Sequence, residues 1–72
     1  MNRVVVVEDE TMARKGIILT IDWSALGCVV VGEAANGEEG AALVERLSPD
    51  IVVTDVKMPR MDGVEMIAKL RE

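Results

Sequence analysis

The sequence predicts an α/β protein in which a parallel three-stranded sheet is flanked by helices. Three apolar runs, each followed by a segment with helical spacing, give the order strand, helix, strand, helix, strand, helix over 72 residues. That alternation is typical of parallel sheets whose strands are joined by right-handed helical crossovers. The apolar runs are rich in valine and lack polar alternation, which is typical of strands covered on both faces. We expect one domain, residues 1–72.

The first strand is predicted at residues 3–7, where four consecutive valines precede Glu8, Asp9 and Glu10. A helix is predicted at residues 11–21, because acidic residues before a helix favour its start. Apolar residues recur there at nearly helical spacing despite a glycine; they are Met12, Ala13, Ile17, Ile18 and Ile21. Residues 22–27 form a connector in which Trp23 is interpreted as a packing anchor rather than a ligand-stacking residue.

The second strand is predicted at residues 28–34, and the single Cys28 within it is interpreted as a buried, inert thiol. Asn36 followed three residues later by Glu39 indicates a variant of the capping box at the start of a helix. This helix is predicted to end at Ser48 and Pro49. Its buried face is predicted to comprise Ala41, Ala42, Leu43, Val44 and Leu47.

The third strand is predicted over Ile51 to Asp55, with its β-branched run at residues 51–53 between Pro49 and Pro59. Asp55 therefore lies at the carboxyl end of this strand. Open parallel sheets bind their ligands at that end, although an aspartate there can also simply cap a turn. A third helix is predicted to begin at Asp62 and Gly63, with an apolar side made of Val64, Ile67 and Leu70.

An acidic site is predicted at the carboxyl ends of the strands. If the first and third strands are neighbours, Glu8, Asp9 and Asp55 share one crevice, where a cation would offset their repulsion. The sequence contains no histidine, and ligation by oxygen alone suits Mg²⁺. A divalent ion held there can neutralise phosphate oxygens while a carboxylate attacks phosphorus. The alternative is that the acids after the first strand only begin the following helix.

Composition limits the classes of partner. The formal net charge of −5 argues against a nucleic-acid surface on this chain and is compatible with a bound cation. No apolar run approaches the roughly 18 residues that can span a bilayer, and no signal-peptide pattern is present. We therefore expect a cytoplasmic protein. Because a chain of 72 residues buries a small core, a partner surface is expected to matter for its stability.

Three blocks of sequence carry a family resemblance. They are VVVVEDE at residues 4–10, VGEAANG at residues 31–37 and PDIVVTDVKMPRMDG at residues 49–63. Together, and in this order, they resemble the receiver domain of two-component response regulators. The third block is the most specific, because a strand-end aspartate followed by Met-Pro and Asp-Gly at this spacing is hard to reach by chance.

The resemblance implies a flavodoxin-like fold with strand order 2-1-3-4-5 in the complete domain. It implies that Asp55 is a phosphoacceptor that takes a phosphoryl group from a phosphohistidine on a sensor histidine kinase. Asp9 would bind Mg²⁺ directly, Glu8 would act through water, and the backbone carbonyl of Lys57 would complete the protein ligands. The family more often has aspartate at position 8, so the extra methylene of Glu8 is expected to change the ligation geometry modestly.

The family also places a Ser or Thr and a Lys on its fourth and fifth strands, and these 72 residues contain neither position. We therefore expect a truncated receiver, half of the flavodoxin-like fold, that is impaired in phosphorylation and switching. The connector at Asp22 and Trp23 resembles receivers joined to a helix-turn-helix domain of the arabinose-regulator type. A DNA-binding output domain is accordingly expected in the parent protein, with no nucleic-acid or membrane binding by this chain.

Other functions are weighed against the receiver. A nucleotide hydrolase needs the phosphate-binding motif Gly-x-x-x-x-Gly-Lys, which is absent. An aspartate-nucleophile phosphatase would have an acid two positions after its nucleophile, where this chain has Lys57. The remaining alternative is a non-catalytic folding or assembly module. Whichever function holds, a homodimer is expected through strand 51–55, whose free edge is a template for pairing with a second copy.

Overall fold

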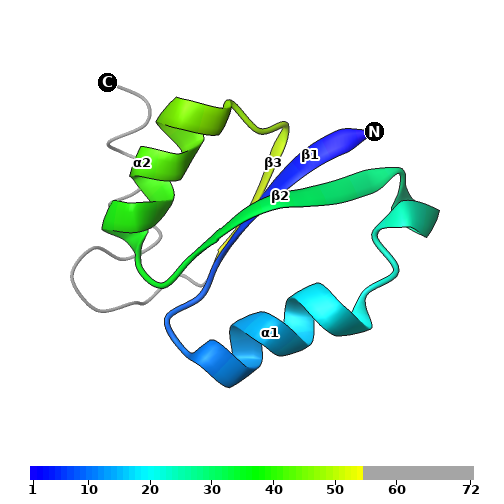
Figure 1. Cartoon of the computed structure of the whole chain (residues 1–72), viewed down its shortest axis with the longest axis horizontal. Coiled ribbons are helices and arrows are strands. Elements are labelled where there is room, and N and C mark those ends of the chain that lie inside the picture. The colour runs from blue at the N-terminus through cyan, green and yellow to red at the C-terminus, as the bar shows by residue number, and fades with distance from the viewer. Residues whose placement is uncertain (55–72) are drawn as a thin grey trace.

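The computed structural model describes residues 1–54 (Figure 1). The elements in chain order are β1 (Asn2–Val7), α1 (Thr11–Thr20), a short 3₁₀ helix η1 (Ser24–Leu26), β2 (Cys28–Ala34), α2 (Gly37–Leu47) and β3 (Ile51–Thr54). The predicted alternation of strands and helices is therefore confirmed up to β3. The predicted third helix lies outside the described residues. No helix in residues 1–54 is long and apolar enough to cross a membrane.

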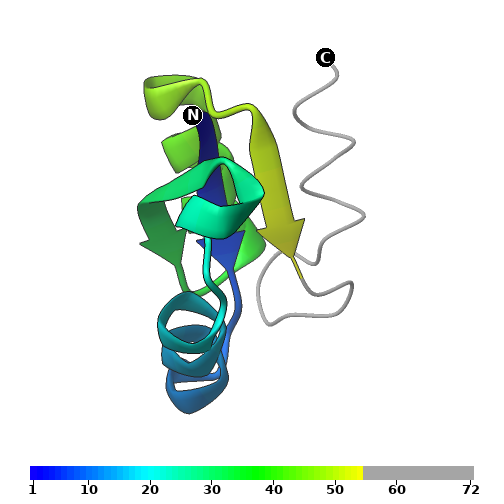
Figure 2. The ribbon, with the colours of Figure 1, turned by 90° about the vertical axis from the view of Figure 1, so that its right-hand side faces the viewer.

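The sheet has the order β2-β1-β3, and both strand pairs are parallel. The strand order 2-1-3 implied by the family resemblance is confirmed for these strands, since β1 and β3 lie side by side with Val4 opposite Ile51 and Val7 opposite Thr54. In the turned view β1 lies between β2 and β3 (Figure 2). Within the described residues β3 is thus an outer strand, and Ile51 is 38% exposed.

The helices α1 and α2 cover opposite faces of this sheet (Figure 1). Because side chains alternate along a strand, Val5 and Val7 pack on the α2 face while Val4 and Val6 pack on the α1 face. All four valines are at most 1% exposed. The prediction that this run is covered on both faces is confirmed, and β1 is the centre of the core.

The strand β2 contains a bulge. Val4 of β1 pairs with Val30, but Val5 pairs with Gly32, so Val31 is an additional residue in β2. A Cβ built on Gly32 would lie only 3.1 Å from a methyl carbon of Leu47. The bulge and the glycine together let α2 pack closely against the sheet.

The start of α2 confirms the predicted variant of the capping box. The side chain of Asn36, which is 6% exposed, accepts a hydrogen bond from the backbone N–H of Glu39 at 2.9 Å. The Glu39 carboxylate in turn accepts from the backbone N–H of Ala35 at 3.0 Å. The predicted buried face of α2 is correct for Ala41 and wrong for Ala42, which is exposed because it does not pack into the cluster around Val5 and Val7.

The first helix packs through a narrower face than its apolar residues suggest. Val4, Val6 and Cys28 form the core on the α1 face of the sheet, here called the α1-side core. Ile17 and Ile18 pack against it, whereas Met12, Ala13 and Ile21 are exposed. The helix ends at Thr20, and Glu10 precedes it without forming a side-chain cap.

The connector after α1 anchors the corner of the fold. The indole Nε1–H of Trp23 donates to the backbone carbonyl of Ile18 at 3.1 Å, and its ring packs in the α1-side core. Cys28 is a buried free thiol in the same core. The interpretations of both residues, as a packing anchor and as a buried thiol, are confirmed.

The connection from α2 to β3 is fixed at the amino end of β1. The backbone N–H of Arg3 donates to a carboxylate oxygen of Asp50 at 2.7 Å, and the Asp50 N–H donates to the Arg3 carbonyl at 2.9 Å. The Arg3 guanidinium also donates to the backbone carbonyl of Leu47, the last residue of α2. These bonds set the register in which β3 runs beside β1.

Candidate functional site

The site begins where β1 and β3 end together. Val7 and Thr54 are paired in the parallel ladder, so β1 and β3 end at the same edge of the sheet. Glu8 is half-buried there, while Asp9 is exposed. Asp55 is the residue after Thr54 in the sequence; it and Lys57 lie outside the described residues.

The turn from β1 into α1, residues 8–10, is held by several hydrogen bonds. The backbone N–H of Glu8 donates to the carbonyl of Ala34, the last residue of β2, at 3.0 Å. The backbone N–H of Glu10 donates to a carboxylate oxygen of Glu8 at 3.3 Å. A guanidinium nitrogen of Arg14 donates to the backbone carbonyl of Glu8 at 2.8 Å. The acidic residues are therefore carried by a turn that both β2 and α1 restrain.

The donors at this edge suit a hard cation. Glu8 and Asp9 offer carboxylate oxygens, and Mg²⁺ prefers oxygen ligands. Within residues 1–54 no three histidine, cysteine, aspartate or glutamate side chains gather closely enough to hold a metal ion.

Comparison with known proteins decides the family. The response regulator receiver domain family matches residues 4–72. The chain belongs to the response regulator receiver family. This receiver chain is 44% identical over 69 residues to the nitrate/nitrite response regulator protein NarL of Escherichia coli strain K12, covering 96% of this chain and 32% of NarL. It is 40% identical to the uncharacterized transcriptional regulatory protein YesN of Bacillus subtilis, covering 97% of this chain and 19% of YesN.

The solved structures agree with the family. The REC domain of AraT, a response regulator from Geobacillus stearothermophilus, matches with a TM-score of 0.90 and 37% identity. The match covers 97% of this chain and 54% of the AraT chain. The flavodoxin-like α/β fold class is thereby confirmed. The receiver chain spans about half of the solved domain and a third or less of the two regulators.

Besides the acidic residues after β1, the receiver chain contains a cluster of ion pairs around Glu33 that the sequence did not predict. The Glu33 carboxylate on β2 accepts hydrogen bonds from Lys15 Nζ at 2.6 Å and Arg14 Nε at 3.0 Å, both on α1. The Lys15 ammonium, followed by the Arg14 guanidinium, lowers the pKa of Glu33 below its ordinary value. No local pattern indicates this group, because its members lie in different elements 18 and 19 residues apart.

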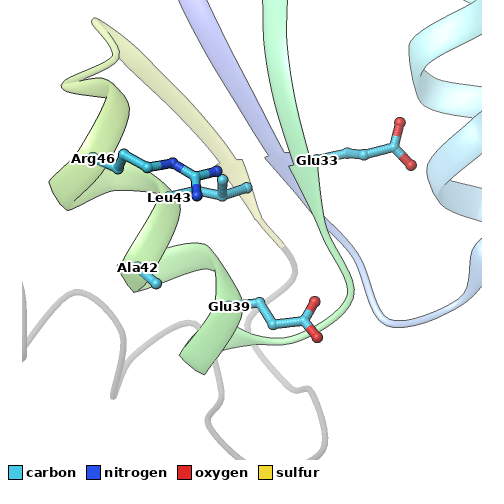
Figure 3. Close-up of a pocket in the computed structure, with 5 residues that line it drawn as sticks. All are labelled: Glu33, Glu39, Ala42, Leu43 and Arg46. Atoms are coloured by element: carbon cyan, nitrogen blue, oxygen red, sulfur yellow. The ribbon is translucent and has the colours of Figure 1, made fainter.

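A hollow of about 300 Å³ lies beside α2 and is lined by Glu33, Glu39, Ala42, Leu43 and Arg46. Its two carboxylates do not converge. The Glu33 side chain extends from β2 toward α1, away from α2 (Figure 3), and Glu39 is bonded to the backbone of Ala35. The hollow therefore lacks the converging polar groups typical of a ligand site. The candidate site remains the edge of the sheet where β1 and β3 end and where Glu8 and Asp9 lie.

Proposed function

We propose that this chain is the phosphoacceptor part of a two-component response regulator, with Asp55 taking a phosphoryl group from the phosphohistidine of a sensor histidine kinase. The observation that carries this proposal is the paired register of Val7 and Thr54, which ends β1 and β3 at one edge of the sheet. Asp55 follows one strand and Glu8 and Asp9 follow the other. The family membership supports the same roles.

The proposed metal ligands of Mg²⁺ are Asp9 directly, Glu8 through water, Asp55, and the backbone carbonyl of Lys57. When bound, the ion supplies positive charge that neutralises phosphoryl oxygens.

The transfer moves one phosphoryl group between two side chains. A carboxylate oxygen of Asp55 forms the new bond to phosphorus, and the bond from phosphorus to the kinase imidazole nitrogen breaks. The electron pair of that bond returns to the imidazole. The receiver thus acts as an acceptor in a signalling reaction, and we infer that it does not turn over a separate substrate as an enzyme.

The test is to incubate the chain with Mg²⁺ and a small acyl phosphate donor, quench it rapidly and measure the intact mass. We expect one added phosphoryl group that hydroxylamine removes, as it does from an acyl phosphate. The yield is expected to be low, because the family's Lys on a later strand, which would add positive charge at the phosphoryl group, has no counterpart in these 72 residues.

The matched variants are Asp55→Asn, which should abolish the modification, and Asp50→Asn, which should retain it. Asp50 is a good control because it precedes the same strand, and an asparagine can still accept the hydrogen bond from the Arg3 N–H. A modification that persists in Asp55→Asn, or the absence of any modification, would contradict the proposal.

A second candidate function, assembly through β3, is favoured by the position of that strand. β3 is an outer strand within residues 1–54, and Ile51 is 38% exposed. We propose that two copies pair through strand 51–55 in antiparallel fashion, which extends the sheet and covers apolar surface. Light scattering after size exclusion tests this directly. A stable monomer at high micromolar concentration would contradict it, as would a dimer unaffected by Val52→Pro.

The setting of the chain is proposed on the family resemblance. We infer a cytoplasmic location and a parent protein in which this receiver precedes a DNA-binding output domain. The net charge of −5 supports the inference that this part of the protein does not itself bind DNA.

A further inference from the structure

The side chain of Arg14 joins the acidic turn to the neighbouring strand. One of its terminal nitrogens donates to the backbone carbonyl of Glu8 at 2.8 Å, and its Nε donates to the Glu33 carboxylate at 3.0 Å. The side chain is only 12% exposed, although α1 is otherwise a surface helix. Arg14 therefore bridges the end of β1 to the end of β2 from a largely covered position.

The bulge in β2 makes this bridge geometrically feasible. Side chains alternate between the two faces of a strand, and an additional residue reverses the alternation beyond it. Val30 packs on the α1 face before the bulge, and Val31 and Gly32 then both face the α2 side. Glu33 consequently points to α1 (Figure 3). Without the additional residue, Glu33 would face α2 and could not meet Arg14.

An arginine suits the position better than a lysine does. A guanidinium holds its donor nitrogens in a rigid plane, so that one side chain can bind two acceptors at fixed separation. Lys15 shows the contrast, because its ammonium is bonded to Glu33 while its side chain is 50% exposed. Exposed ion pairs of the Lys15 kind contribute little to stability. Arg14 differs from Lys15 in that it also binds the Glu8 carbonyl.

We propose that Arg14 is a positioning residue that fixes the turn at residues 8–10, with Glu33 as its anchor on β2. The carbonyl that Arg14 binds belongs to the residue between the last valine of β1 and Asp9. By holding this peptide group, Arg14 limits the orientations open to the carboxylates on either side of it. The part of the inference that concerns a cation rests on the proposed function, and the part that concerns the turn stands on the hydrogen bonds alone.

The first test uses the metal-free chain and amide hydrogen exchange. The readout is the exchange rate of the Glu8 amide, which donates to the carbonyl of Ala34, relative to that of the Val6 amide in β1. We expect Arg14→Gln to raise this ratio about tenfold, as the loss of a charge-assisted hydrogen bond implies.

Lys15→Gln is the matched control, because it also removes an ion pair with Glu33 but leaves the Glu8 carbonyl bond in place. The ratio is expected to stay nearly constant in this variant. An equal rise in both variants, or no rise in Arg14→Gln, would overturn the proposal. Global destabilisation alone would raise the exchange rate of the buried Val6 amide at least as much as that of the Glu8 amide, so only local opening of the turn raises the ratio.

The second test is Mg²⁺ affinity, measured by titration of the same variants. We expect Arg14→Gln and Glu33→Gln to weaken binding by about tenfold, a typical effect of losing a group that orients a metal ligand. Arg14→Lys is expected to recover part of the affinity.

The two proposals fail in different ways. If the unchanged chain does not bind Mg²⁺, the proposed cation site is wrong, and the exchange ratio still decides whether Arg14 fixes the turn. If Arg14→Gln binds Mg²⁺ with the same affinity as the unchanged chain, the proposed cation site stands. The proposal that Arg14 positions the ligands of that site is then refuted.

Discussion

Truncation of a buried valine in β1 is expected to remove a large part of the stability of this small domain. Val6 is 0% exposed and packs in the α1-side core. Val6→Ala deletes two carbon atoms, each contributing about 0.8 kcal/mol when buried. The cavity left behind adds to this loss, so we expect a total of about 2 to 3 kcal/mol. A domain of this size has a free energy of unfolding of roughly 4 to 11 kcal/mol.

Val29→Ala is the matched control, because it makes the same chemical change in the adjacent strand β2 at a position that is 41% exposed. Both substitutions lose similar strand propensity. The control loses only part of the transfer free energy and leaves no closed cavity, so about 1 kcal/mol is expected.

Urea unfolding followed by far-UV circular dichroism measures both free energies of unfolding. The denaturant slope should be the same for the parent and both variants. Equal costs for Val6→Ala and Val29→Ala would refute the conclusion that β1 is the buried centre of the sheet.

Three further outcomes follow from local features. Asn36→Ala should lower the free energy of unfolding by about 1 kcal/mol, since it removes the cap of α2. Asn36→Asp retains the acceptor and should lose less stability. An equal fall in melting temperature in the two variants would contradict this. Gly16→Ala should stabilise the chain by about 0.5 to 1 kcal/mol, because the added Cβ meets no atom within 4 Å and alanine favours the helix; a lower melting temperature would contradict this. The Glu33 pKa is lowered by Lys15 and then Arg14, so its stabilising contribution is complete above its ordinary pKa of 4.5 and is lost as the pH falls through the lower folded value. Urea unfolding at pH values from 6 to 3 should show a smaller loss of unfolding free energy on acidification in Glu33→Gln than in the unchanged chain. An identical loss in both would contradict this.

The parts of the fold that depend on local sequence could be predicted. Four valines in succession are typical of a strand covered on both faces, and Asn36 with Glu39 marks a helix start by a bond that spans three residues. The detail of the cap was beyond prediction, since Glu39 bonds to the N–H of Ala35 and not to that of Asn36 itself.

The parts that depend on tertiary packing could not be predicted. Ala42 and Met12 are apolar residues in helices, and only the docked orientation of each helix shows that both are exposed. The bridge from Arg14 to Glu33 depends on a one-residue bulge in β2, which no pattern in the valine-rich run reveals. The site residues Glu8 and Asp9 could be placed at a strand end, but their meeting with Asp55 and Lys57 remains a prediction.

The most direct test of the central claim is a Mg²⁺ titration followed by backbone amide chemical shifts. If the carboxyl ends of β1 and β3 form the cation site, millimolar Mg²⁺ should shift the amides of residues 8–10 and of Asp55, and Asp9→Asn should suppress these shifts. Asp22→Asn, in the connector after α1, should not. Shifts that are absent at millimolar Mg²⁺, or that persist unchanged in Asp9→Asn, would contradict the account.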